Sequence, residues 1–160
     1  MEEKIQQELE AKFEALKGHI RIQRARRIFV EVPDDGLFPA VFDYAVKALE
    51  FGHLLMITGL DEGAVFGVLY HLARGGVILT LKRYCPRENP VIKTITPYFP
   101  AGDNYERELV DLLGIRVEDL PPGPRYPLPE NWPAGEYPLR KDWKKNDECG
   151  MMNADTEKKP

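Results

Sequence analysis

The sequence has few of the residues from which metal and redox centres are built. Among its 160 residues there are two cysteines, Cys85 and Cys149, and three histidines, His19, His53 and His71. Two cysteines are too few for a disulfide framework or for an iron–sulfur cluster held by this chain alone. The histidines lack the HxxH and HExxH spacings that are typical of metal sites. We therefore expect no metal site in this chain.

Long apolar runs and a basic excess are also missing. The longest apolar stretches, such as Leu54–Ile57 and Val65–Leu69, are far shorter than the ~20 residues of a membrane span. The chain opens on polar residues 1–4, so we expect no secretory signal and an intracellular, soluble domain. The net charge of −4, from 26 acidic and 22 basic residues, argues against a free-standing nucleic-acid-binding domain.

What the sequence does contain is a regular succession of helix and strand patterns. Apolar residues recur every three or four positions over 5–16 and 38–49, which predicts two amphipathic helices, the first ended by Gly18. Residues 20–32 predict two strands or one bent strand. Turn sequences separate three further predicted strands, at 54–60, 65–72 and 77–84. This order predicts an α+β fold, in which a mixed or antiparallel sheet carries helices on one face.

The pattern changes after Pro86. Residues 86–104 are predicted to be loop-like, and a short helix is predicted from Asp103 to Leu113. Asp103 and Glu106 have the spacing of a capping box, and Gly114 is suited to a C-terminal cap.

The densest charge cluster of the chain lies on this predicted helix, at residues 106–111. Paired carboxylates could serve acid–base catalysis, but Asp103–Arg107 and Arg107–Asp111 have the i,i+4 spacing of ordinary helix-surface pairs. No nucleophile or metal ligand is spaced with them. We therefore predict that the cluster has a structural role or contacts another subunit, and we predict no catalytic residue.

Residues 119–143 combine proline with aromatic side chains. Seven of the fourteen prolines fall within residues 121–138, which prevents a helix or a central strand. Aromatic residues along a stiff extended chain predict a tail that wraps a partner, gains little by folding back, and is ordered only against that partner. The predicted organisation is therefore a core over 1–118, this tail over 119–143, and a polar, disordered end over 144–160.

Two segments resemble the signatures of one family. Residues 98–115 have an aromatic-Pro-Ala opening, a Glu-Arg-Glu triplet at 106–108, Asp111, and a final Gly114-Ile115. This pattern is similar to the signature of the 30 kDa subunit family of respiratory complex I. Residues 137–142, Tyr-Pro-Leu-Arg-Lys-Asp, resemble the second hallmark of that family. The resemblance covers about residues 65–143.

The sequence departs from the respiratory members between these two segments. They usually carry a Gly-His-Pro step and paired arginines, where this chain has Asp119-Leu120-Pro121 and Pro124-Arg125. The lead-in at residues 132–137 is more similar to the related subunits of membrane-bound, energy-converting nickel–iron hydrogenases and formate hydrogenlyases. The resemblance therefore favours the hydrogenase branch.

The resemblance implies a cofactor-free accessory subunit of a peripheral arm, on the cytoplasmic side of the cell membrane and attached to it only through the complex. Its implied partners are a large catalytic subunit, with the nickel–iron site or the quinone pocket, and small subunits with iron–sulfur clusters. Arg140 is the expected clamp for a partner carboxylate. The signature or interface residues are Glu106, Arg107, Glu108, Asp111, Gly114, Trp132, Tyr137, Leu139, Arg140, Lys141, Asp142 and Trp143.

Two other classes of function stay open. A stand-alone small enzyme could use His71 with Glu106 or Asp111. A soluble adaptor or nucleic-acid-binding domain could use the basic patch at Arg21–Arg27.

Overall fold

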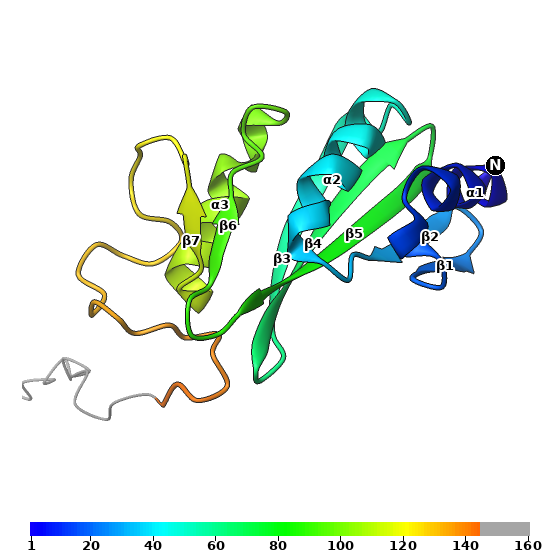
Figure 1. The fold of residues 1–160 in the computed structure, drawn as a ribbon. Helices are drawn as coiled ribbons and strands as arrows, with labels where there is room; N and C mark the ends of the chain where they lie inside the picture. The colour runs from blue at the N-terminus through cyan, green and yellow to red at the C-terminus, as the bar shows by residue number, and fades with distance from the viewer. Residues whose placement is uncertain (145–160) are drawn as a thin grey trace, which may run out of the picture.

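The computed structural model describes residues 1–144 (Figure 1). The polar end predicted at 144–160, including Cys149, lies outside the described residues except for Lys144. The helices and strands are α1 (Glu2–Lys12), β1 (Ile20–Arg24), β2 (Arg27–Glu31), α2 (Phe38–Lys47), β3 (His53–Asp61), β4 (Val65–Arg74), β5 (Val77–Pro86), β6 (Val91–Lys93), α3 (Asp103–Leu113) and β7 (Arg116–Glu118). Short 3-10 helices lie at Glu14–Leu16, Asp35–Leu37 and Pro100–Gly102.

Five strands form one mixed sheet in the order β1-β2-β5-β4-β3. The pairs β1–β2, β3–β4 and β4–β5 are antiparallel, and β2 pairs in parallel with β5. The turn between β4 and β5 uses Gly75 and Gly76, both with positive φ, as a tight hairpin between right-twisted strands requires. The predicted α+β fold with a mixed sheet is confirmed.

The helices cover one face of this sheet (Figure 1). Alternate residues of β4 point to that face, where the Tyr70 ring packs 5.0 Å from Phe38 and 5.5 Å from Phe42 of α2. At the β3 end, α3 approaches so closely that a Cβ on Gly59 would overlap the Leu113 side chain. Helix α3 is thus seated directly on the edge strand of the sheet.

The region between β5 and α3 differs from the predicted loop. It contains β6, which pairs in parallel with β7, and a 3-10 helix, and it buries Ile92, Ile95 and Phe99. A three-residue strand is too short to show an alternating pattern in the sequence. The first helix also ends earlier than predicted, at Lys12, because Phe13 is extended and packs edge-on against Tyr44 at 5.6 Å.

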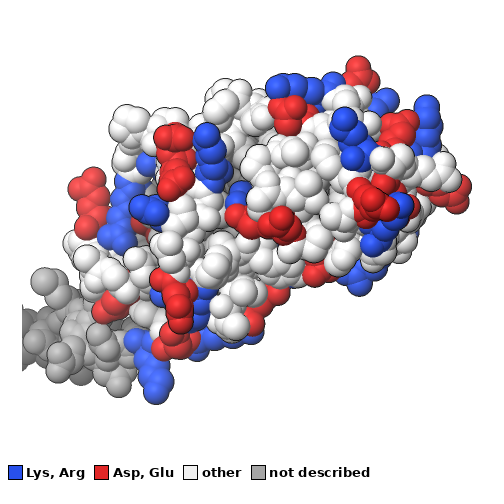
Figure 2. Space-filling model, in the orientation of Figure 1, with Lys and Arg blue, Asp and Glu red and all other residues white. Residues whose placement is uncertain are grey.

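Charges of both signs are interspersed on the surface that Figure 2 shows. In the predicted basic patch, Arg21 lies 3.7 Å from Glu31 and stacks 5.3 Å from the Phe29 ring. Arg21 thus contacts two side chains of the neighbouring strand β2.

Candidate subunit interface at helix α3 and the proline-rich segment

Helix α3 ends in a glycine that brings the two signature segments together. Gly114 has φ +70°, and its N–H donates to Val110 O at 3.0 Å, so the predicted C-cap is confirmed. A Cβ at this position would lie 2.5 Å from Tyr137 Cζ and 2.6 Å from Arg140 Nη2. Both the backbone conformation and the contact with residues 137–140 therefore require glycine.

Glu106 faces the interior of the chain. Its carboxylate is fully buried and accepts hydrogen bonds from Thr94 Oγ1 at 2.5 Å and from the Ile95 N–H at 2.7 Å. Burial raises the pKa of Glu106, while these two hydrogen bonds oppose the rise. The predicted capping box is wrong, because Gly102 occupies the N-cap and Glu106 holds the segment after β6 instead. With no exposed surface, this side chain is a structural group and has no contact to offer a partner.

Arg107 joins α3 to the proline-rich segment, residues 119–143. Its Nε lies 2.7 Å from Asp103 Oδ1, which confirms the predicted i,i+4 pair, and its Nη2 donates to Pro121 O at 2.5 Å. A Cβ on Gly123 would lie 2.5 Å from Arg107 Nη2. Glycine at this position lets the chain pass directly over the guanidinium.

Asp111 pairs differently from the prediction. It accepts from Arg125 Nε at 3.0 Å and from the Leu128 N–H at 3.2 Å, and within residues 1–144 no Arg107–Asp111 ion pair forms. Arg107 is already held by Asp103 and Pro121. The Asp111 side chain, 9% exposed, is instead neutralised by an arginine from the proline-rich segment.

The proline-rich segment runs beside α3 (Figure 1) and is hydrogen-bonded to α3 and to Asp61 at the β3–β4 hairpin. Arg125 also donates Nη1 to Trp132 O at 3.0 Å, and the Trp132 and Trp143 rings lie 6.0 Å apart. The prediction that this segment gains little by folding back is therefore wrong. The segment forms no β-sheet hydrogen bonds, but its side chains and backbone N–H groups donate hydrogen bonds to carboxylates and carbonyls of α3.

Arg140 closes the C-terminal end of α3. Its guanidinium lies 4.3 Å from the Tyr137 ring and 5.2 Å from the Phe66 ring, and its Nε donates to Leu113 O at 2.7 Å. A cation at this end also complements the helix dipole. The expected clamp on a partner carboxylate is therefore replaced by a clamp on the chain's own helix.

The remaining residues of the second signature meet the β3–β4 hairpin. The Asp61 carboxylate accepts from Arg87 Nη1 at 2.8 Å, from the Lys141 N–H at 2.8 Å and from the Gly63 N–H at 2.9 Å. Arg87 also pairs with Asp142 at 2.6 Å. Hydrogen bonding to Arg87 holds the pKa of Asp61 well below its usual range. The sequence analysis did not identify Asp61 or Arg87, because Asp61 lies in a turn motif and Arg87 lies in a region predicted as a loop.

Several predicted interface residues keep free surface. Leu139 is 55% exposed, and the Lys141 side chain points into solvent. Trp132 and Trp143 are half-buried. Glu108 is half-buried and forms no hydrogen bond or ion pair with any residue of the described range 1–144. Leu139, Lys141 and Glu108 are therefore the side chains of the signature that contacts within residues 1–144 leave most available.

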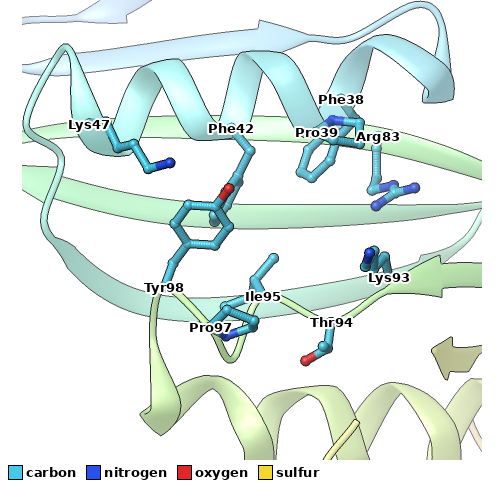
Figure 3. A pocket seen from close by; sticks show the side chains of 10 residues that line it. All are labelled: Phe38, Pro39, Phe42, Lys47, Arg83, Lys93, Thr94, Ile95, Pro97 and Tyr98. Atoms are coloured by element: carbon cyan, nitrogen blue, oxygen red, sulfur yellow. The ribbon is translucent and has the colours of Figure 1, made fainter. Parts of the chain in front are cut away.

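A cavity of about 490 Å³ lies between α2 and residues 93–98 (Figure 3). Two of its cations are neutralised within the chain, because Lys47 pairs with Asp43 at 2.6 Å and Arg83 donates to both oxygens of Asp35 at 2.7 Å. The lining contains no histidine, cysteine or carboxylate; its other members are Phe38, Pro39, Phe42, Lys93, Thr94, Ile95, Pro97 and Tyr98. These residues form a mainly apolar hollow, in which the Thr94 and Tyr98 hydroxyls are hydrogen-bonded to Glu106 and Asp43.

His71 is not brought to the acids of α3. Its Nδ1 lies 3.0 Å from Thr80 Oγ1, and burial lowers its pKa. Because neighbouring residues of a strand point to opposite faces, and Tyr70 points to the helix-covered face, His71 points to the other face. The small-enzyme alternative, which paired His71 with Glu106 or Asp111, has no geometric basis here.

The described residues hold no group of three or more His, Cys, Asp or Glu side chains arranged for a metal ion. Cys85 is buried, and burial raises the pKa of its thiol to about 11. Among helices α1 to α3, none combines the length and the apolar character that crossing a bilayer demands.

The same fold occurs in chains of two solved structures. A chain of the membrane-bound sulfane sulfur reductase, an archaeal respiratory membrane complex, matches with a TM-score of 0.72 over 89% of this chain and 85% of that one, at 23% identity. A trypsin-resistant fragment of Nqo5 matches with a TM-score of 0.62 over 76% of this chain and 98% of the fragment, at 27% identity. The architecture of this chain is thus shared with both of these chains.

The sequence defines the family more narrowly. Residues 30–148 match the model of the family described as respiratory-chain NADH dehydrogenase, 30 Kd subunit, and the chain belongs to this family. The resemblance recognised from the two signature segments is confirmed.

Three relatives show the range of the family. The C subunit of the F(420)H(2) dehydrogenase of Methanosarcina mazei is 34% identical over 64% of this chain, and that of the NADH-quinone oxidoreductase of Chloroherpeton thalassium is 36% identical over 61%. The beta subunit of the membrane-bound hydrogenase of Pyrococcus furiosus is 34% identical over 59%. The matched region spans 67%, 42% and 57% of these relatives, respectively.

Proposed function

We propose that this chain is an accessory subunit of the peripheral arm of a membrane-bound redox complex, of the energy-converting nickel–iron hydrogenase or NADH:quinone oxidoreductase type. In this role it docks on the large catalytic subunit and supports electron transfer coupled to ion translocation. The observation that carries the proposal is the family match over residues 30–148, which includes both signature segments. The named relatives are subunits of a dehydrogenase, a quinone oxidoreductase and a membrane-bound hydrogenase.

The structure supports a docking role through the surface it leaves free. The polar groups of α3 mostly bond within the chain, with the exception of Glu108. Glu108 and the neighbouring Leu139 and Lys141 side chains remain available to a partner. An exposed apolar side chain flanked by unpaired charges of both signs is suited to a contact between subunits. The half-buried Trp132 and Trp143 add aromatic area of the kind that dominates interface energies.

The proposal extends to cofactors and location. We place the iron–sulfur clusters in small partner subunits and the nickel–iron or quinone site in the large subunit, with none in this chain. The complex would hold the chain at the cytoplasmic side of the membrane. The lead-in at residues 132–137 favours the hydrogenase type; the three relatives, at 34 to 36% identity, do not separate the branches.

Gentle isolation from membranes tests the proposal. A chain with an affinity tag at its N-terminus should recover a large catalytic subunit and small iron–sulfur subunits in fixed stoichiometry. The visible spectrum and the metal content should belong to the complex and be absent from the chain purified alone. Recovery of a monodisperse chain without partners, or stoichiometric iron or flavin in the isolated chain, would refute it.

A further inference from the structure

The hollow between α2 and residues 93–98, about 490 Å³ in volume, has walls that the fold holds in place. Glu106 fixes one wall, because its buried carboxylate accepts a hydrogen bond from Thr94 Oγ1. The Tyr98 hydroxyl donates to Asp43 of α2 at 2.7 Å and thereby ties this wall to the helix. A hollow with fixed walls needs little further ordering when a partner enters it.

The hollow is open to solvent between two lysines (Figure 3). Lys47 lies at one end and Lys93 at the other, and their side chains are 67% and 70% exposed. Pro39 of α2 and Pro97 of the opposite wall are exposed as well. An apolar lining that is open to solvent along its length suits a segment of another protein better than an enclosed small molecule.

The charged side chains that line the hollow are all cations. Arg83 and Lys47 are held by aspartates at 2.7 and 2.6 Å. Lys93 is held only loosely, because its Nζ lies 3.8 Å from Asp119 Oδ2 and both side chains are more than two-thirds exposed. Exposed pairs of this kind contribute little to stability, so the Lys93 charge is available to another acidic group. The hollow is therefore complementary to an apolar side chain with a carboxylate beside it.

We propose that this hollow receives an apolar side chain from another subunit of the complex, and that an Asp or Glu close to it in the same segment pairs with Lys93. The identity of the partner as a subunit of the complex rests on the proposed function. A well-packed apolar anchor in a pocket is where the binding energy of an interface is concentrated. The acid lies at the Lys93 end of the hollow, because Asp43 already neutralises Lys47 at the other end.

Photo-crosslinking in the assembled complex identifies the occupant. The photo-reactive residue benzoylphenylalanine, introduced at the exposed position of Pro97, should crosslink to one other subunit, and mass spectrometry locates the site. The crosslinked segment should contain an apolar residue with an Asp or Glu within about four positions of it, the spacing of neighbours on one helix face. A lysine in place of that acid should weaken assembly as much as Lys93→Glu does, and the two changes together should restore assembly.

Two pairs of variants test the charge and the hollow separately. Lys93→Glu should weaken assembly by at least about fivefold, whereas Lys4→Glu, the same change at an exposed, ion-paired lysine of α1, should assemble normally. Pro39→Trp places a large ring at the hollow and should weaken assembly by at least about tenfold. Ala40→Trp, at the next exposed position of α2, which does not line the hollow, should assemble normally. Circular dichroism of each variant confirms that the chain is folded.

Recovery of partner subunits with the tagged chain separates this proposal from the proposed function. If the wild-type chain recovers its partners, but position 97 crosslinks to none of them, or Lys93→Glu and Pro39→Trp assemble normally, the hollow is not a docking site and the proposed function stands. A crosslink to a second copy of this chain, or to a segment without an acid, would also overturn the inference, as would equal losses in Pro39→Trp and Ala40→Trp. Absence of any partner for the wild-type chain would overturn both.

Discussion

The half of the molecule built on α2 and the large sheet is held by apolar packing, whereas in the half built on α3 the proline-rich segment is held to the helix largely by polar contacts. Phe42 alone meets four aromatic rings at centroid distances of 5.4 to 6.2 Å. In the other half, three arginines join the proline-rich segment to the rest of the chain. Arg87 bonds to Asp142, Arg107 bonds to Pro121 O, and Arg140 bonds to Leu113 O.

This difference follows from how much backbone hydrogen bonding each half can form. The paired strands satisfy one another's N–H and C=O groups except along the two outer edges of the sheet, and the helices then need only cover an apolar face. The strands β6 and β7 have three residues each, and prolines remove further donors from the segment that follows. Hydrogen bonds from side chains take the place of the missing backbone hydrogen bonds in this half. The stability of the two halves should therefore respond differently to cavities, to steric changes and to pH.

Phe42→Ala should have the largest effect, because it removes a ring from the centre of the apolar half. Phe42 is 2% exposed, and large-to-small substitutions of buried aromatics cost about 3–5 kcal/mol. Urea unfolding measures the loss. Tyr126→Ala, at an aromatic that is 42% exposed in the polar half, is the control and should cost far less. Similar losses for both variants would contradict the comparison.

Gly114→Val should detach the second signature segment from α3. The left-handed backbone conformation costs a residue with a Cβ about 1–2 kcal/mol, and overpacking against Tyr137 and Arg140 adds about 1–3 kcal/mol. Gly135→Val is a matched control, because Gly135 has φ +80° but no atom within 4 Å of the Cβ position. Limited proteolysis should cleave residues 119–144 faster in Gly114→Val only, and equal cleavage in both variants would refute the steric role of the Tyr137–Arg140 contact.

Most of the architecture was predictable from the sequence because its signals are local. The helix at 103–113 and its glycine cap were predicted at the observed residues. The spacing of its apolar residues and the glycine that ends it both lie within a short stretch of sequence. The strands of the large sheet were also predicted, within one or two residues at their ends. In contrast, β6 and β7 escaped prediction because three residues cannot display a period.

The contacts of the candidate interface were not predictable in the same way. The Asp61 carboxylate is reached from Lys141, 80 positions further along the chain, and no sequence pattern links the two residues. Glu106 and Asp111 were recognised as important, but the sequence does not reveal that they face Thr94 and Arg125. Family resemblance identified the residues, and only the fold shows that most of them bind other residues of the same chain.

Two carboxylates should give this protein opposite pH responses. The pKa of Asp61 is lowered, so the folded state binds fewer protons than the unfolded state, and stability falls as pH drops from about 5 towards 2. The pKa of Glu106 is raised, so its contribution is complete below about pH 4.5 and is lost as pH rises through the folded-state value.

The variants Asp61→Asn and Glu106→Gln isolate these two contributions. Asp61→Asn should flatten the decline of the free energy of unfolding below pH 5, and Glu106→Gln should remove the decline that sets in above about pH 4.5. Urea unfolding in a pH series on both variants and the wild-type chain measures the slopes. If both substitutions changed the slope over the same pH range and in the same direction, the assignment of one carboxylate to each response would be wrong.

Lys141→Ala should have the smallest effect on the isolated chain. Lys141 contributes its backbone N–H to Asp61, which alanine keeps, and its exposed side chain forms no ion pair within residues 1–144. The free energy of unfolding should therefore change by less than about 0.5 kcal/mol. Arg140→Ala, one residue earlier, should cost about 1–3 kcal/mol, because it removes the stacked guanidinium and its hydrogen bond to Leu113 O. A loss in Lys141→Ala as large as that in Arg140→Ala would show that the whole segment serves the chain's own fold. Unchanged stability together with weaker capture of the large subunit would instead show that the Lys141 charge contacts the partner. Within the second signature segment, Arg140 would then serve the fold of the chain and Lys141 its assembly.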